Sequence, residues 1–508
     1  MTGLVTIRVA LRLVTTLASL TLLAVASPQC LLVAWSAPPI PAGDAPACAV
    51  AFDEHFVTQT MRVDYYHSGN ADEDRIAVER IIRDGVWAGS RTRLTDPLDL
   101  GLYGFEVRDQ QSQQLLYAQR FCSVFGEWQT TAPARQHWGT FHASLRFPWP
   151  RQPVEVTLKQ RHGGTWRTLW TTTIDPHSRF VINADPPVQH PVWTVLENGP
   201  VEQKVDLLLL ADGYTAGEME KFHADAQRMT DRLFTVEPFQ SRRADFNVRA
   251  IDVPSSQSGV AQPRDGVFHR SALGCQYNTF DLERYVLTCD NRTLRDVASA
   301  APYDYLVILL NNSKYGGGGI YNDQTTVAVD CPAADYILVH ELGHHLAGLG
   351  DEYYVSQVAY ETGKRPRFEP WEPNITALLD GHALKWGDLV SPGTPIPTPW
   401  AKEAFETAAR AQQRQAPKPV QTASGEDDAQ SPAVAREPQR ATAEILQASP
   451  YAGRIGAFEG ASYEAHGLYR PAIDCIMFSR NPAGFCAVCQ RAIAQAIDQH
   501  TAVSIADR

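Results

Sequence analysis

Two histidines with a glutamate between them, in the order His340-Glu341-Leu-Gly-His344, have the spacing of a metal-binding helix. Residues four apart on an α-helix lie one turn above each other, so both imidazoles can reach one ion. Glu341 lies one step round the helix, where a general base can take a proton from a metal-bound water. The pattern predicts a hydrolase with one catalytic Zn²⁺ as cofactor and a protein or peptide as substrate.

A catalytic zinc ion needs a third protein ligand besides the two histidines and a water. We expect the helix to end at Gly348, because glycine accepts the left-handed conformation of a helix C-terminus. The chain can then return a carboxylate to the metal. Asp351 is the predicted third ligand, Glu352 is the nearest alternative, and Glu459 and Glu464 are more distant ones.

The predicted reaction is hydrolysis of a peptide bond by zinc-activated water. Glu341 takes the proton of that water, whose pKa zinc lowers toward about 7, and returns it to the leaving amine. Tyr469 is predicted to hydrogen-bond the developing oxyanion, with a core tyrosine beneath the site as the equal alternative. His345 points about 100° away from His344 on an ideal helix and is expected to pack.

The elements that must hold this site follow an α/β (α+β) pattern over residues 201–508. Apolar runs at 205–211 and 303–310 predict strands buried on both faces, and residues 216–233 and 333–346 predict helices. The glycine cluster that precedes residues 325–329 lacks the Lys-Ser/Thr of a nucleotide loop. We expect it to lead into an edge strand beside the metal helix, where an extended peptide could add main-chain hydrogen bonds.

Two further regions flank or interrupt this predicted domain. Residues 45–185 alternate short β-prone runs with turn signals, which predicts an N-terminal β-sandwich without catalytic spacing, and residues 186–200 read as a proline-rich linker. Residues 398–449, rich in Ala, Gln, Pro and Glu, predict a mobile insertion that contains a helical piece at 400–415.

Composition and the N-terminus indicate an exported protein. The chain has 45 basic and 57 acidic residues, a net charge of −12, which argues against a nucleic-acid partner. Arg8 and Arg12 precede an apolar run that predicts a signal peptide and leader within residues 1–37, cleaved after Ala26 or Ala37. The mature protein is then secreted or periplasmic without a stable membrane span. A retained membrane anchor is the alternative.

Three stretches together closely resemble peptidase family M64, the group named for an immunoglobulin A-cleaving bacterial metallopeptidase. They are HELGHHLAGLGDEYY at 340–354, GLYRPAIDCIMFS at 467–479 and FCAVCQRAI at 485–493. The resemblance covers about residues 200–500, and the β-rich N-terminal region resembles the N-terminal domain of that family. It implies a metzincin-like zinc peptidase domain in which Met477 forms a hydrophobic floor beneath the zinc without binding it.

The turn after the metal helix departs from the general metzincin spacing. Metzincins place a glycine seven residues and the third ligand ten residues after the first histidine. Here Gly348 and Asp351 lie eight and eleven residues after His340, as if one residue were inserted before the turn. The spacing resembles that of family M64.

The cysteines of an exported chain predict disulfides. If Cys30 leaves with the leader, eight of the nine cysteines remain. The predicted pairs are Cys48 with Cys122, Cys275 with Cys289, Cys331 with Cys475, and Cys486 with Cys489. The alternative is a second, structural zinc held by Cys475, Cys486 and Cys489, for which the sequence indicates no fourth ligand.

The sequence therefore predicts an exported zinc endopeptidase. A zinc amidohydrolase that cleaves cell-wall peptide crosslinks is the second enzyme hypothesis, and a surface-binding protein with a vestigial metal site is the non-enzyme hypothesis. Glu341 argues against a vestigial site, because a purely structural metal needs no acid beside its ligands. Nothing in the sequence specifies the protein substrate.

Overall fold

The structure is a computed structural model that describes residues 50–184, 190–354, 367–415, 439–481 and 483–501. These residues belong to one compact unit that begins at Val50. The predicted signal and leader, Cys48 and part of the predicted insertion lie outside the described residues. Among the described helices, none is long and apolar enough to cross a membrane.

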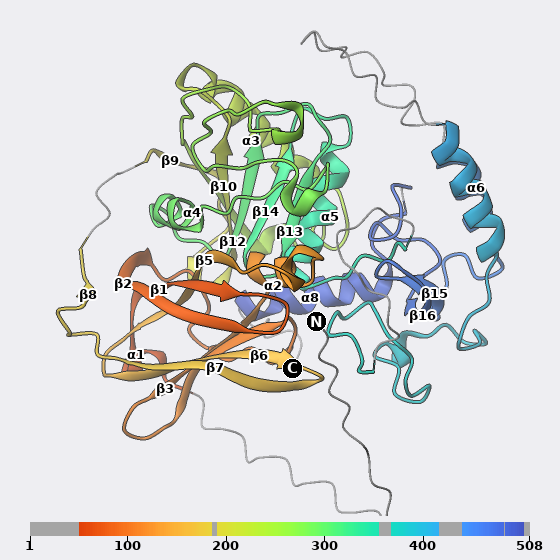
Figure 1. Cartoon of the computed structure of the whole chain (residues 1–508). Helices are drawn as coiled ribbons and strands as arrows, with labels where there is room; N and C mark the ends of the chain where they lie inside the picture. The colour runs from red at the N-terminus through yellow and green to blue at the C-terminus, as the bar shows by residue number, and fades with distance from the viewer. Residues whose placement is uncertain (1–49, 185–189, 355–366, 416–438, 482, 502–508) are drawn as a thin grey trace, which may run out of the picture. The chain divides into compact units, whose positions relative to one another are not determined.

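The N-terminal part of the described chain is a pair of four-stranded sheets, as predicted (Figure 1). One sheet has the order β5-β1-β2-β8 and the other β4-β3-β6-β7. The apolar side chains of both sheets form a single core, which includes Val63, Phe105 and Val156. The strands are β1 (Phe56–Gly69), β2 (Asp74–Val86), β3 (Tyr103–Asp109), β4 (Leu115–Phe121), β5 (Gly139–Pro150), β6 (Val154–His162), β7 (Thr165–Ile174) and β8 (Val181–Ile182), with the short helices α1 (Phe52–His55) and α2 (Val124–Gln129).

A six-stranded sheet with the order β13-β14-β12-β10-β11-β9 forms the centre of the second part. Its four inner strands run parallel, and the edge strands β9 and β13 run antiparallel to their neighbours. The strands are β9 (Val192–Leu196), β10 (Val205–Asp212), β11 (Phe246–Ile251), β12 (Tyr305–Leu310), β13 (Gly317–Ile320) and β14 (Gln324–Ala328). Residues predicted as linker thus include an edge strand, β9.

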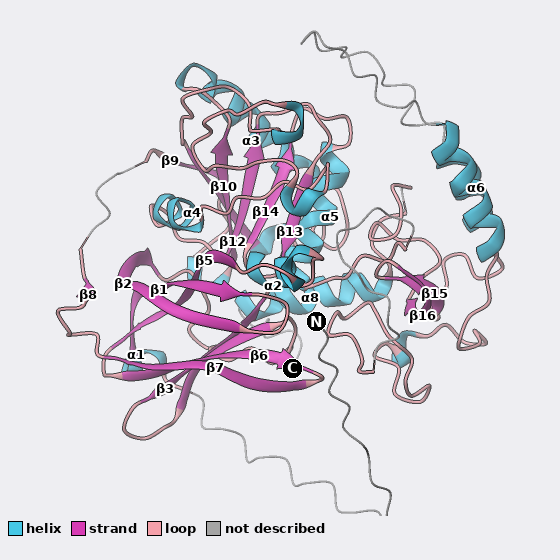
Figure 2. Ribbon diagram, viewed as in Figure 1, coloured by secondary structure: helices cyan, strands magenta, loops and turns pink. Residues whose placement is uncertain are grey.

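Helices cover both faces of this sheet (Figure 2). Val205 and Leu207 of β10 pack in one core with α3 (Met219–Leu233), α5 (Ala334–Ala347) and α8 (Ala487–His500). Leu208 and Leu210 pack in another core with α4 (Asn291–Ala298). Alternate residues of one strand therefore serve two cores, which explains the largely apolar run at 205–211, in which Asp206 is the one charged residue.

The remaining elements follow α5 along the chain. They are α6 (Lys402–Gln415), α7 (Gln439–Gln447) and the hairpin of β15 (Phe458–Ala461) and β16 (Glu464–Arg470). The helix α6 matches the helical piece predicted at 400–415. The hairpin joins the segment after α5 through main-chain hydrogen bonds between Thr376 and Tyr469.

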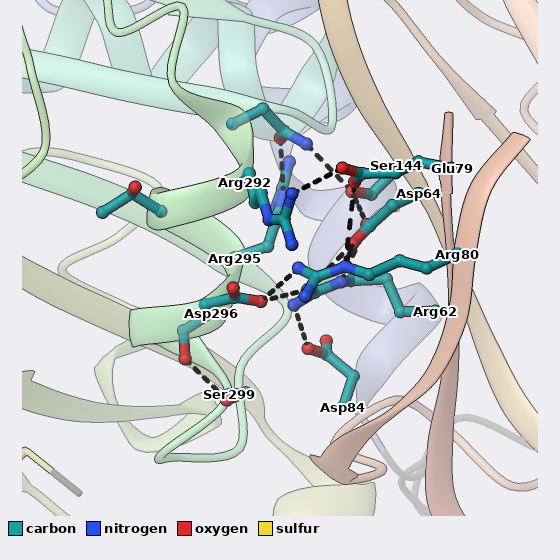
Figure 3. A network of polar contacts seen from close by, with 12 residues as sticks. Arg62, Asp64, Glu79, Arg80, Asp84, Ser144, Arg292, Arg295, Asp296 and Ser299 are labelled. Carbon is teal, nitrogen blue, oxygen red and sulfur yellow. Dashed lines mark hydrogen bonds and ion pairs between the residues drawn. The ribbon is translucent and has the colours of Figure 1, made fainter. Parts of the chain in front are cut away.

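Charged side chains join the N-terminal sheets to the second part of the molecule (Figure 3). Arg62 of β1 is fully buried and forms ion pairs with Asp64 and Asp84 of its own sheet and with Asp296 of α4. Arg80 of β2 also reaches Asp296, at 2.6 Å. Breaking such a buried network is costly, because it leaves charges without partners. The network therefore holds α4 against the sheet of β1 and β2.

Candidate active site

Three side-chain atoms converge beside the end of α5. Nε2 of His340 lies 3.2 Å from Nε2 of His344 and 3.1 Å from Oδ1 of Asp351. Nε2 of His344 lies 3.3 Å from the same carboxylate oxygen. The structure thus brings together the two histidines and the aspartate that the spacing nominates as ligands.

These three atoms are spaced as ligands of one zinc ion. A tetrahedral ion with bonds of about 2.0–2.1 Å keeps its ligand atoms about 3.3–3.4 Å apart. The other ring nitrogen of each histidine faces a backbone carbonyl, Ile476 O at 3.1 Å for His340 and Leu349 O at 2.5 Å for His344. A hydrogen bond from Nδ1 leaves the Nε2 lone pair available to a metal, so the residues fit the implied ion.

The turn after α5 carries Asp351 back to the histidines. Gly348 adopts φ +60° and caps the helix, as its position in the sequence predicts. Asn374 then holds Gly350 by accepting from its N–H at 2.7 Å and donating to its carbonyl at 2.9 Å. The Ser462 N–H donates to Asp351 O at 2.8 Å. Side-chain and backbone partners on both sides therefore keep this short reversal in place.

Tyr463, at the tip of the β15–β16 hairpin, hydrogen-bonds the second carboxylate oxygen of Asp351. Its backbone has φ +65°, an uncommon conformation for an aromatic residue, and its N–H donates to Tyr353 O at 3.0 Å. The tip conformation therefore directs the phenol at the ligand. Sequence reasoning missed Tyr463, because no helical or strand period connects it to Asp351.

The electrostatics of the three groups suit a divalent cation. Burial opposes ionisation of Asp351, but the charge of His344 and hydrogen bonds from both histidines hold its pKa well below the usual range. Burial likewise opposes protonation of His344, but the charge of Asp351 raises its pKa to about 9. The cluster thus keeps one carboxylate ionised and attracts positive charge.

Glu341 and the three candidate ligands line one cleft with a volume of about 370 Å³. The same cleft is lined by Cys122 and Glu127 of the N-terminal part, and Tyr285, which also lines it, donates a hydrogen bond to Glu127. The N-terminal part therefore forms a wall of the candidate active site, a role that its sequence does not indicate.

Met477 lies directly beneath α5 and is fully buried. Its sulfur would be 3.3 Å from a Cβ at Gly343, so the glycine lets the methionine approach the helix. His345 points to the other side, where Nδ1 lies 2.9 Å from Thr325 Oγ1, and burial lowers its pKa to about 3. This is the packing role expected for it.

The other residues nominated from the sequence lie elsewhere. Glu352 is fully buried beside Cys489 and is not among the residues that line the cleft. Glu459 pairs with Lys402 at 3.0 Å. Neither Glu464 nor Tyr469 is among the residues that line the cleft, whereas Tyr353 and Tyr463 are. The tyrosines that line the cleft are Tyr285, Tyr321, Tyr353 and Tyr463; Tyr353 belongs to the third-ligand turn and Tyr463 to the hairpin tip.

The predicted disulfides within the described residues are not formed. All described cysteines are free, including both members of the pairs predicted at 275 and 289, at 331 and 475, and at 486 and 489. Cys475 instead lies with Cys486 and Cys489 around Glu352. The pair predicted between Cys48 and Cys122 is not described, because Cys48 is outside the described residues.

Comparison with protein families matches residues 194–497 to the family described as IgA Peptidase M64 and residues 51–169 to the description Peptidase M64 N-terminus. The chain belongs to peptidase family M64. A search of curated proteins finds no match.

The family assignment confirms the resemblance drawn from residues 340–354 and from the two C-terminal stretches. M64 is a metallopeptidase family, so the chain belongs with peptidases, and protein substrates and a metal ion are implied. All the residues that line the cleft, from Leu102 to Tyr463, lie inside the two matched ranges.

Proposed function

We propose that this protein is an exported zinc endopeptidase with a metzincin-like catalytic domain. The observation that supports the proposal best is the convergence of His340 Nε2, His344 Nε2 and Asp351 Oδ1 within 3.1–3.3 Å of one another in the cleft that Glu341 lines. The methionine beneath the helix and the edge strand beside it support the metzincin-like assignment.

Each residue of the cleft has a defined part in the proposed reaction. Bound zinc would supply Lewis acidity, which acidifies water and polarises the scissile carbonyl. The Glu341 carboxylate takes the water proton and later delivers it to the leaving amine nitrogen. Tyr463 holds the Asp351 carboxylate in its orientation through the hydrogen bond to its second oxygen.

The edge strand β13 is placed to hold an extended substrate. On the side away from β14, Gly317 N–H donates to Arg284 O at 3.2 Å, and Gly317 O accepts from Val286 N–H at 3.3 Å. Because alternate residues of a strand bond the same neighbour, the main-chain groups of Gly319 face this outer side too, and Gly319 lines the cleft. A peptide laid there would pair with Gly319 by β-augmentation.

The decisive variant is Glu341→Gln, which keeps the size of the side chain and removes the base. We expect zinc content to be unchanged and cleavage of casein to fall by at least about 100-fold, the usual contribution of general acid–base catalysis. Zinc is measured by mass spectrometry of the metal and cleavage by peptide release. Glu220→Gln on the exposed face of α3 is the control and should behave as the unaltered protein.

Two outcomes would contradict the proposal. Casein cleavage that survives Glu341→Gln would remove Glu341 from the mechanism. Casein left intact by a zinc-loaded protein that releases peptides from cell-wall crosslinks would favour the amidohydrolase hypothesis instead.

Export is part of the proposal and rests on residues 1–37 alone. N-terminal sequencing of the protein recovered from outside the cytoplasm of its host should begin after Ala26 or Ala37. A mature chain that retains Met1 would contradict export with cleavage and favour the retained anchor.

A further inference from the structure

Outside the cleft, three thiols and one carboxylate gather in the core. They belong to Glu352, Cys475, Cys486 and Cys489, and one ligand atom from each lies within 4.8 Å of all the others. Glu352, Cys475 and Cys489 are fully buried. Cys486 is half-buried. Four potential metal ligands from three segments of the chain thus lie together, three of them fully buried.

The sulfur spacing differs from that of a disulfide and matches that of two ligands of one zinc ion. Cys475 Sγ and Cys489 Sγ are 3.8 Å apart. A disulfide needs about 2.05 Å between its sulfur atoms. A tetrahedral zinc with Zn–S bonds of about 2.3 Å holds its sulfur ligands about 3.8 Å apart. The geometry therefore favours shared coordination over a covalent pair.

Glu352 supplies the fourth ligand that the cysteine spacing alone lacks. Its Oε1 lies 3.2 Å from Cys489 Sγ and accepts a hydrogen bond from Asn374 at 3.0 Å. Its Oε2 is buried and has no hydrogen-bond partner among the described residues. An unpartnered buried carboxylate oxygen is costly, and a cation in the cluster would offset that cost.

We propose that Glu352, Cys475, Cys486 and Cys489 bind a second, structural zinc ion. Thiolates are soft ligands that select zinc, and four protein ligands leave no position for a catalytic water. The buried guanidinium of Arg470 interacts electrostatically with Glu352 and Cys475 and offsets part of the negative charge of the ligand set.

This second site would fasten together the parts that position the first. Glu352 directly follows the candidate ligand Asp351, and its N–H donates to Met477 O at 2.9 Å. Cys475 precedes Met477 by two residues, and Cys486 and Cys489 lie at the start of α8. One ion would thus tie the third-ligand turn, the methionine segment and the C-terminal helix.

A third cluster, formed by Asp64, Glu79 and His142, also has the spacing of metal ligands but differs in how its charges are paired. Its carboxylates are paired with arginines: Asp64 with Arg62 and Arg80, and Glu79 with Arg292 (Figure 3). Carboxylates that are already paired with arginines have little need of a cation, whereas Oε2 of Glu352 has no hydrogen-bond partner among the described residues.

Metal stoichiometry tests the proposal on the full chain purified under reducing conditions. We expect two zinc ions per chain in the unaltered protein and one in the His340→Ala/His344→Ala variant. Refilled with Co²⁺ in place of zinc, that variant should keep the intense near-ultraviolet charge-transfer absorption of thiolate–cobalt bonds. Imidazole and carboxylate ligands do not give this absorption, so the spectrum reports the cysteine site alone.

Variants of the second site complete the test. Cys489→Ser should lose one zinc and the thiolate–cobalt absorption, whereas Cys289→Ser, at an exposed cysteine, should keep both. If Cys489→Ser fails to fold, the double histidine variant alone decides. The second site would be overturned if the unaltered chain held one zinc ion and the double histidine variant held no zinc and showed no thiolate–cobalt absorption. That outcome would leave the proposed peptidase function standing.

Discussion

The Asp351 carboxylate is held at both oxygens, one by the two histidines and the other by Tyr463. As the proposed third zinc ligand, a carboxylate fixed in this way would keep its orientation when a substrate enters. Outer partners of metal ligands typically contribute about 10–100-fold in metal affinity or activity. The phenol of Tyr463 is therefore expected to matter although it lies 112 residues from the carboxylate in the chain.

Tyr463→Phe removes this hydrogen bond and keeps the ring. We expect zinc affinity or kcat/KM to fall by about tenfold or more. Tyr469→Phe is the matched comparison, because Tyr469 lies on the same hairpin but is not among the residues that line the cleft. Zinc competition titration and peptide-cleavage kinetics give the two numbers. A larger loss from Tyr469→Phe would restore the role predicted for Tyr469 from the sequence.

The site residues that could be predicted from the sequence are those related by short-range periodicity. His340, Glu341 and His344 follow from the helical repeat, and Asp351 follows from the reversal at Gly348. Tyr463 could not be predicted, because its contact arises from a hairpin that folds back on the turn. Glu352, the nearest alternative for the third ligand, lies among cysteines instead, with Oε1 3.2 Å from Cys489 Sγ.

Among the elements, the helix α5 and the strand β13 lie in unusually close contact. A Cβ at Gly319 would lie 2.2 Å from the backbone oxygen of Glu341, and one at Gly317 would lie 2.5 Å from Ile337. The glycines therefore permit the edge strand to lie directly on the metal helix. The sequence predicted an edge strand after the glycine cluster, whereas in the structure the glycines themselves form the edge.

Gly319→Ala should separate these two elements, because the added methyl meets backbone atoms that cannot rotate away. We expect kcat/KM to fall by about tenfold or more and thermal stability to drop, since overpacking costs about 1–3 kcal/mol. Gly381→Ala is the control, because nothing lies within 4 Å of its Cβ position. Calorimetry and cleavage kinetics measure both effects. Unchanged behaviour of Gly319→Ala would show that the contact is dispensable.

The sequence predicts the strands that are buried on both faces of the sheet, but it does not predict the strands at the sheet edges. β10 and β12 are buried along their whole length and largely apolar because both faces are covered, and the apolar runs are visible in the sequence. The prolines around β9 predict a linker, yet β9 pairs with β11, whose residues lie about 50 positions further along the chain. Pairing of that kind leaves no local pattern to recognise.

For the molecule as a whole, the network around Arg62 decides how the N-terminal sheets are held. Sequence could predict the β-sandwich from its alternation, but it could not predict which surface of it docks. The arginines and aspartates involved are scattered from β1 to α4 and show no spacing of their own. These ion pairs contribute to stability because they are buried, and their burial arises only when the chain folds.

Arg62→Met should weaken this docking, because it leaves the buried carboxylates of Asp64 and Asp84 without their main cation. We expect the free energy of unfolding to fall by about 3–5 kcal/mol. Arg410→Met, in an exposed pair with Glu406, should cost no more than about 0.5 kcal/mol. Denaturant unfolding measures the difference. Equal effects of the two substitutions would mean that the network adds nothing to docking.

The helix α2 and its flanking residues form a wall of the cleft that can change in sequence without altering the candidate metal ligands. Cys122 and Glu127 line the same cleft as the candidate metal ligands, yet they belong to a part of the chain that supplies neither a candidate ligand nor the proposed base. Mutations there can reshape the channel for substrate while the catalytic apparatus stays untouched. Exchanging residues 122–130 between relatives is thus a modular way to redirect cleavage, in nature or in the laboratory.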